Sequence, residues 1–273
     1  HDATVTAKDY QRLHDQHRLI ADVVAFKGPH INHLTPRTLD IDMIQNGMQQ
    51  KGITPKAVIE GPPRRRCPIL LRQTSFKALQ ETVAFTDQDG IATGSHTARF
   101  GEIEQRGAAL TPKGRELYDS LLNAARAELG EFPSESNAEK YTAILEKHFK
   151  DFPDDYAELH DKGLAYFRYF PTPKGIASRS NSHRPSSRQE LIAQGHIQYE
   201  PLVYEDFLPV SAAGIFQSNL GDDSQAHYAG SSNQAEFEKA LGQKVTNELK
   251  LYADTQRRSL LDCSTILAVS PLV

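Results

Sequence analysis

The stretch Arg99-Phe-Gly-Glu-Ile-Glu-Gln-Arg106 alternates side chains in the manner of a β-strand, and the fold expected for this chain is built around it. Successive side chains of a strand point to opposite faces, so Glu102 and Glu104 should share one face. A pair of inward-facing acids would be costly unless a cation neutralised them, which favours metal binding by one of them. The ordinary alternative is that both are surface charges on a solvated face.

Extended segments and one helix precede this strand. Residues 30–37 are predicted as a short extended segment, followed by a helix over residues 39–50 that Asp40 or Asp42 caps. The further extended candidates are residues 57–60, 69–74 and 83–86, with a hairpin turn at Asp89-Gly90. This order of strand, helix, then three or more strands resembles the βαβββ module of vicinal-oxygen-chelate proteins, whose sheet curls around a metal.

Helices are expected on either side of the strands. Residues 8–26 have the apolar spacing of one amphipathic helix, which Gly28-Pro29 ends. The elements predicted after Gly107 are helices over residues 112–127, 137–149 and 234–258, a long loop over 171–189 that is either a lid or a solvated excursion, and an apolar, partly extended segment over 200–218.

The predicted fold class is therefore α+β, with a vicinal-oxygen-chelate-like curled mixed sheet around a metal and helices surrounding it. Residues 1–110 are expected to form the metal-binding βαβββ-type module with its leading helix. Residues 111–273 are expected to form a helical and mixed segment that packs on this module and completes the substrate pocket.

Composition narrows the partners and the compartment. The 273 residues carry a formal net charge of -4, so the cationic excess of nucleic-acid-binding proteins is missing, and small molecules are the expected partners. No apolar run is long enough for a membrane span, and the start lacks a signal pattern. The two cysteines, Cys67 and Cys263, lack metal-type spacing and fit a reducing, cytoplasmic compartment.

Histidine and carboxylate residues on strands that could converge direct the search for a metal site. Iron(II) is commonly held by two imidazoles and one carboxylate, which leaves positions open for the substrate and O2. His30 and His33 are three positions apart and would point to opposite faces of a regular strand, so they cannot both be ligands from it. A histidine taken at random is more often structural than a ligand.

The arginine and lysine side chains can be either surface charges or groups that bind a substrate. Arg72 and Lys77 flank a predicted strand and could pair with a dicarboxylate, although solvated surface charge is the more common fate of such residues. Residues 64–66 are three arginines after two prolines, which predicts an exposed turn with no assigned role.

Four longer runs closely resemble the bacterial 2-hydroxyglutarate synthase (2-oxoadipate dioxygenase/decarboxylase) family, which is related to vicinal-oxygen-chelate dioxygenases. The similarity covers nearly the whole chain, including residues 204–220, and runs of this length are far more specific than a short motif. The runs are His30-Ile-Asn-His-Leu-Thr-Pro-Arg-Thr-Leu-Asp-Ile-Asp42, Val58-Ile-Glu-Gly-Pro-Pro63, Ile69-Leu-Leu-Arg-Gln-Thr-Ser-Phe-Lys-Ala78 and Arg99-Phe-Gly-Glu-Ile-Glu-Gln-Arg-Gly-Ala108.

The resemblance implies roles for individual residues. His33 matches the histidine that begins the metal-binding strand, and it is the first expected ligand. Glu102 is the expected carboxylate ligand, in preference to Glu104, because the run from Phe100 is similar to the Phe-x-Glu-Ile-x-Gln-Arg pattern that ends the 4-hydroxyphenylpyruvate dioxygenase module. Val210 and Ser211 match a stretch that lines the family's substrate pocket.

One part of the family pattern is missing from this sequence. Full-length members have an upstream portion, which supplies a further metal-binding histidine and an arginine that holds the substrate carboxylate. The chain starts at His1 with a segment that looks like the middle of a domain. We expect either a fragment or a substitute ligand, for which His96 is the nearest candidate.

The implied activity is that of an Fe(2+)-dependent dioxygenase that converts 2-oxoadipate and O2 to 2-hydroxyglutarate and CO2 in lysine degradation. Its small-molecule partners would be a 2-oxo dicarboxylic acid and O2. Two alternatives stay open, namely a metal-dependent isomerase or hydrolase of the same fold and an inactive, metal-free binding module.

Overall fold

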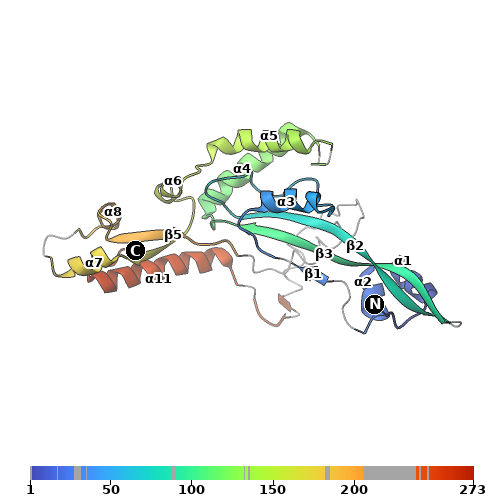
Figure 1. The fold of residues 1–273 in the computed structure, drawn as a ribbon. Coiled ribbons are helices and arrows are strands. Elements are labelled where there is room, and N and C mark those ends of the chain that lie inside the picture. Colours follow the sequence, from blue (N-terminus) through green and yellow to red (C-terminus); the bar gives the residue numbers. More distant parts are fainter. Residues whose placement is uncertain are drawn as a thin grey trace. The chain divides into compact units, whose positions relative to one another are not determined.

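Helices and small sheets give the chain a mixed α+β structure, as predicted (Figure 1). The computed structural model describes residues 2–16, 18–27, 32–34, 36–87, 90–131, 133–134, 136–181, 185–205, 238–239, 241–244 and 246–273. These residues fall into two compact units, one formed by residues 2–60 and 73–105 and the other by residues 61–72, 106–205 and the described part of 238–273. Within the described ranges, no helix has the length and apolar character needed to span a membrane.

A three-stranded sheet is the frame of the first unit. Its strands are β1 (Asn32–Leu34), β2 (Leu71–Asp87) and β3 (Gly90–Arg106), with β3 in the middle. Only two residues separate β2 from β3, so these long strands run antiparallel and side by side (Figure 1). β1 pairs with β3 in parallel.

The strands are longer and fewer than predicted. The predicted segments 69–74 and 83–86 belong largely to one strand of 17 residues, and the predicted strand over 99–106 is the end of another strand of 17 residues. The polar residues between positions 77 and 82 suggest a break, but a strand tolerates them wherever one face of its sheet is not buried. The hairpin turn is predicted at Asp89-Gly90; Asp89 lies outside the described residues, and Gly90 is the first residue of β3.

The predicted strand over residues 57–60 does not form. Glu60 makes an isolated antiparallel bridge to Gln73 of β2, and Pro55 makes another to Phe76. These two bridges do not share one register, and proline has no N–H to donate, so no continuous ladder develops. The segment therefore follows the edge of β2 without being a regular strand.

Helix α3 (Ile41–Gln50) follows β1 as predicted. Asp40, rather than Asp42, is its N-cap, because the Asp40 carboxylate accepts a hydrogen bond from the Met43 N–H at 3.1 Å. Gln45 links this helix to β2, since its carbonyl oxygen accepts a hydrogen bond from the Thr74 hydroxyl at 2.6 Å.

The single helix predicted over residues 8–26 is wrong. The structure has two helices there, α1 (Ala7–Gln16) and α2 (Arg18–Ala25), which pack against each other. One straight helix could not bring both segments to the same patch of β2, and both segments have apolar side chains to bury there. The chain therefore changes direction between them.

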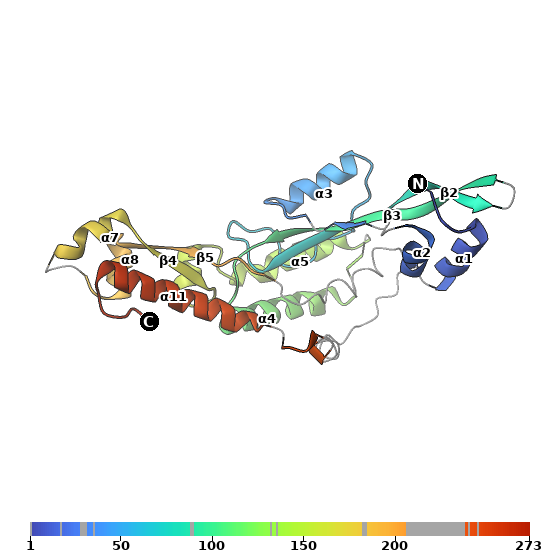
Figure 2. The same cartoon turned by 90° about the horizontal axis from the view of Figure 1, so that it is seen from below.

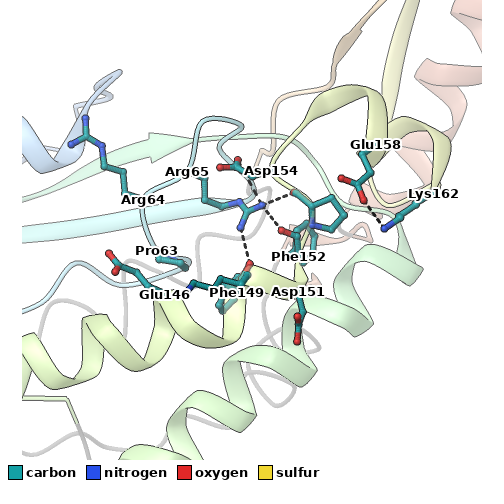
Figure 3. A pocket seen from close by; sticks show the side chains of 12 residues that line it. Pro63, Arg64, Arg65, Glu146, Phe149, Asp151, Phe152, Asp154, Glu158 and Lys162 are labelled. Atoms are coloured by element: carbon teal, nitrogen blue, oxygen red, sulfur yellow. Dashed lines mark hydrogen bonds and ion pairs between the residues drawn. The ribbon is translucent and has the colours of Figure 1, made fainter.

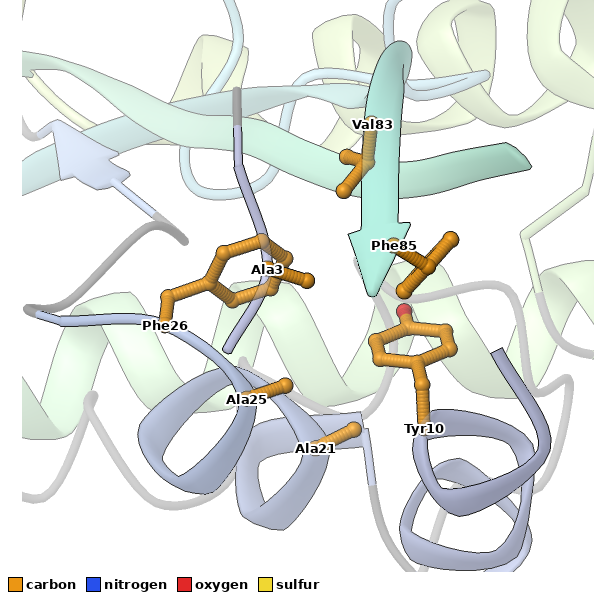
Figure 4. Close-up of a cluster of buried hydrophobic side chains, with 7 residues drawn as sticks. All are labelled: Ala3, Tyr10, Ala21, Ala25, Phe26, Val83 and Phe85. Carbon is orange, nitrogen blue, oxygen red and sulfur yellow. The ribbon is translucent and has the colours of Figure 1, made fainter. Parts of the chain in front are cut away.

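The apolar cluster that holds these helices to the sheet is small but well buried (Figure 4). The ring of Tyr10 lies 5.0 Å from the ring of Phe85, measured between centroids. A Cβ atom at Gly94 of β3 would lie 2.7 Å from the Phe85 ring, so glycine leaves room for that ring. The members are Ala3, Tyr10, Ala21, Ala25, Phe26, Val83 and Phe85.

An antiparallel strand pair and a long helix are central to the second unit. Strands β4 (Phe167–Pro171) and β5 (Ile197–Pro201) pair along their whole length. Helix α11 (Glu248–Leu267) packs along β4 (Figure 2). The other helices of this unit whose bounds are described are α4 (Pro112–Leu129), α5 (Ala138–His148), α6 (Tyr156–Asp161), α7 (Pro173–Ala177) and α8 (Arg188–Ala193), with single 3-10 turns η1 (Phe149–Asp151) and η2 (Ser178–Ser180).

The helices predicted over residues 112–127 and 137–149 are confirmed as α4 and α5. Thr111 caps α4 by accepting a hydrogen bond from the Gly114 N–H at 3.1 Å, and Pro112 occupies the first turn. The helix ends at Gly130, whose φ of 74° is left-handed.

Two predictions in the second half are wrong in part. The region 171–189 is not one loop, because Thr172 caps α7, η2 follows, and Ser187 caps α8. The predicted final helix over residues 234–258 is correct only in part: residues 238, 239 and 241 are helical, residues 242–244 and 246–247 are not, and α11 begins at Glu248 and continues to Leu267. Its start is fixed by Asn247, whose side chain accepts a hydrogen bond from the Lys250 N–H at 2.8 Å. Residues 234–237 lie outside the described part of the chain.

Candidate metal site

Strands β1 and β3 bring the two predicted ligand positions onto neighbouring strands. His33 lies opposite Phe100, and farther along Arg37 forms a parallel bridge with Glu104 in the same register. Position 102 is therefore two residues along β3 from the partner of His33. The backbone of this pairing supports the predicted neighbourhood of His33 and Glu102.

Hydrogen bonds fix this register close to the two glutamates. The Glu104 N–H donates to the Pro36 carbonyl at 3.0 Å, and the Thr38 N–H donates to the Glu104 carbonyl at 2.8 Å. These two bonds lie on either side of Arg37. A slip by one residue would have to break both of them and would exchange the faces of the strand.

Both glutamates are buried, so the interpretation as solvated surface charges is wrong. The exposed fraction is 2% for Glu102 and 6% for Glu104. Burying an ionised carboxylate costs several kcal/mol unless a cation or hydrogen bonds compensate it. A metal ion bound at this face would be one such compensating cation.

The chemistry of the donor set suits iron(II). A carboxylate oxygen and an imidazole nitrogen are ligand types that non-haem iron uses, and Glu102 provides a desolvated anion for a dication. Among the described residues there is no group of three or more histidine, cysteine, aspartate or glutamate side chains that could hold a metal. The described side chains thus offer Glu102 as one candidate ligand and not a full set.

Of the other predicted site residues, some are described only by their backbone and some are not described at all. His33 and His96 are described as backbone positions of β1 and β3, and their side chains lie outside the description. His30, Val210 and Ser211 lie outside the described residues altogether. The substrate-binding role of Val210 and Ser211 stays a prediction.

Arg72 is not the solvated surface charge that is most common for such a residue. It is 8% exposed, and its Nε donates a hydrogen bond to the Pro62 carbonyl at 3.0 Å. Lys77 belongs to β2, but its side chain lies outside the description.

The prediction that residues 64–66 form an exposed turn without a role is wrong for Arg65. Its side chain is 5% exposed and lies in the wall of a pocket of about 510 Å³ in the second unit (Figure 3). The guanidinium donates to the carbonyls of Phe149, Phe152 and Pro153, at 3.4 Å and 2.9 Å for the first two. Arg65 therefore holds the end of the α5 to η1 segment.

Asp154 completes this arrangement. Its carboxylate accepts hydrogen bonds from the backbone N–H groups of Arg66 and Cys67 at 3.1 Å and 2.9 Å, and it lies 3.7 Å from the Arg65 guanidinium. Burial lowers the pKa of Arg65, and the charge of Asp154 opposes that shift. The pocket mixes both signs of charge around a structural arginine, and none of the predicted ligands lines it.

Sequence reasoning missed Arg65 because its partners are distant in the chain. The run of three arginines gives no local signal that distinguishes the middle one. The two preceding prolines restrict the backbone, which is the one feature that marks the segment as rigid.

The described residues form an α+β protein, and comparison with known proteins shows the family to which it belongs. A model of the 2-oxoadipate dioxygenase/decarboxylase family matches residues 1–219. The chain belongs to this family.

Individual relatives are close in sequence and structure. The chain is 70% identical to the 2-oxoadipate dioxygenase/decarboxylase of Pseudomonas putida over 266 residues and 53% identical to that of Escherichia coli over 264, covering 97% of this chain each time. A crystal structure of the hydroxyglutarate synthase from Pseudomonas putida in complex with 2-oxoadipate matches with a TM-score of 0.80 and 66% identity, covering 98% of this chain. The chain spans 57% of the length of each of these three proteins.

Proposed function

We propose that this chain carries the metal-binding sheet of an Fe(2+)-dependent dioxygenase that converts 2-oxoadipate and O2 to 2-hydroxyglutarate and CO2. The observation that carries the proposal is the buried carboxylate of Glu102 on the strand that pairs with the strand of His33. The substrate class comes from the relatives, whose names state 2-oxoadipate as the compound they act on or bind.

The finer fold assignment in this proposal is a vicinal-oxygen-chelate-like sheet. Its support is the topology of the first unit. Across the sheet the order is β1, β3, β2 and then the segment with Pro55 and Glu60, and β1 is parallel to β3. In this proposal residues 1–110 form the metal-binding module.

In the proposed site, His33 and Glu102 are ligands of the iron. The metal, when bound, supplies a Lewis acid and a redox centre for the reaction of the 2-oxo acid with O2. Glu102 offsets one of the two positive charges of the iron. Val210 and Ser211 are proposed to contact that substrate, with Ser211 offering a hydroxyl to its polar end.

The proposed ligand Glu102 has to be buried and held in a fixed position. A carboxylate that is 2% exposed has little water to lose when the metal binds, and the β1 to β3 register holds it in place. A reducing, cytoplasmic compartment is part of the proposal and is supported by two free, buried cysteines, Cys67 and Cys263.

The test is the stoichiometry of O2 consumption and CO2 release with 2-oxoadipate in the iron-loaded protein. We expect one O2 consumed per CO2 released and a loss of turnover of at least about a hundredfold in His33→Ala and Glu102→Gln. Glu60→Gln is the matched control, because Glu60 is an exposed glutamate of the same unit that pairs with Lys56. Turnover that needs another divalent ion and no O2 would instead favour an isomerase or hydrolase.

A further inference from the structure

The second buried glutamate of β3 has no part in the proposed ligand set. Strand alternation places positions 102 and 104 on one face, roughly 7 Å apart along the strand. Both carboxylates are buried, with exposed fractions of 2% and 6%. A site with two imidazoles and one carboxylate uses only one of them. Burial of a carboxylate is costly unless cations or hydrogen bonds compensate it, and a metal ion bound at this face would add to that compensation.

The surroundings of Glu104 show how it is held. Its backbone N–H and carbonyl are both used in hydrogen bonds, to Pro36 and from Thr38. Arg37, the residue between them, is the register partner of Glu104. Glu104 is thus fixed at the point where the register of the two ligand strands is set.

We propose that Glu104 is a positioning residue of the metal site and not a ligand. Its backbone hydrogen bonds hold the register that sets His33 beside Glu102. The negative charge of its side chain, two residues along the same face from Glu102, strengthens the binding of the dication. This inference rests on the proposed function, because it assumes that Glu102 and His33 bind iron.

The two tasks of Glu104 predict different effects of charge and of size. Glu104→Gln keeps the shape of the side chain and removes its charge. Glu104→Asp keeps the charge and shortens the side chain. A purely structural role would be affected by both changes, whereas a role that depends on charge would be affected mainly by the first.

The experiment measures the dissociation constant of Fe(II) without O2, by competition with a chelator, and the visible absorption spectrum of the cobalt(II)-loaded protein. We expect Glu104→Gln to weaken Fe(II) binding by about tenfold, in the range seen for residues that support metal ligands. Its cobalt spectrum should keep the shape of the unaltered protein. Glu104→Asp should stay within about threefold, Glu60→Gln should be unchanged, and Glu102→Gln should both weaken binding more strongly and alter the spectrum.

Three outcomes would overturn the inference alone, in a protein that binds iron. They are an unchanged affinity in Glu104→Gln, equal losses in Glu104→Gln and Glu104→Asp, and a cobalt spectrum of Glu104→Gln altered like that of Glu102→Gln, which would make Glu104 a ligand. An unaltered protein that binds no iron would overturn the proposed function, and this inference with it.

Discussion

The backbone N–H of Thr38 donates to the carbonyl of Glu104 at 2.8 Å, and this bond joins the segment after β1 to the strand that carries Glu102. Thr38→Pro removes the donor, so we expect the free energy of unfolding to fall by about 1–3 kcal/mol and Fe(II) affinity to fall with it. Urea denaturation and chelator competition measure the two effects.

Thr38→Ala is the control for this change, because alanine keeps the N–H and loses only the side-chain hydroxyl, which accepts from the Asp40 N–H at 3.2 Å. It should cost no more than about 1 kcal/mol. If Thr38→Pro were as stable as Thr38→Ala, the bond to Glu104 would not hold the register.

Arg65 should be one of the costliest polar residues to replace in the second unit. Arg65→Met leaves three carbonyls and Asp154 without their buried cation, so we expect a loss of about 3–5 kcal/mol in the free energy of unfolding. Arg64→Met changes an exposed neighbour and should cost about 0.5 kcal/mol or less. Equal urea midpoints for the two variants would contradict the structural role of Arg65.

Tyr252 of α11 holds the backbone of Glu205 through its hydroxyl group. Its hydroxyl accepts from the Glu205 N–H at 2.7 Å and donates to the Glu205 carbonyl at 2.8 Å. Tyr252→Phe should cost about 1–3 kcal/mol, and Tyr252→Leu should cost more because the buried ring is lost as well. Thermal denaturation compares them, and a phenylalanine variant as stable as the unaltered protein would show that these bonds add nothing.

Alkaline stability should depend on Tyr118 of α4. Burial raises the pKa of Tyr118 to about 12, and its side chain contacts Phe149 within the core. The folded pKa exceeds the unfolded value of 10.0, so the stabilisation is complete below pH 10 and is lost as pH rises from 10 toward 12.

Tyr118→Phe should therefore lose less stability over that pH window than the unaltered protein, by about 2 kcal/mol at most. The measurement is the urea midpoint as a function of pH. The same slope in both proteins would mean that this phenol is not held protonated by the fold.

Local signals in the sequence predict the elements whose ends carry caps. Asp40 before α3 and Thr111-Pro112 at α4 are examples, because a side-chain oxygen at the N-cap acts within three residues. The same reasoning fails for the single helix over residues 8–26. Its division into two follows from the cluster with Val83 and Phe85, which lies far along the chain.

For the candidate metal site, too, the sequence predicts the local pattern but not the packing of distant segments. Alternation predicts that Glu102 and Glu104 share a face, but it cannot distinguish a buried face from a solvated one. Their burial depends on tertiary packing, and the pairing of β1 with β3 joins segments more than sixty residues apart. The choice of His33 and Glu102 as ligands came from resemblance to the family and stays a prediction.

The most direct test of the account is a crystal structure of the iron-loaded protein with an anomalous difference map at the iron absorption edge. We predict one strong peak within bonding distance of the Glu102 carboxylate and of the His33 imidazole, with Glu104 outside that distance. A peak bound by Glu104, or none near β3, would contradict the proposed metal site.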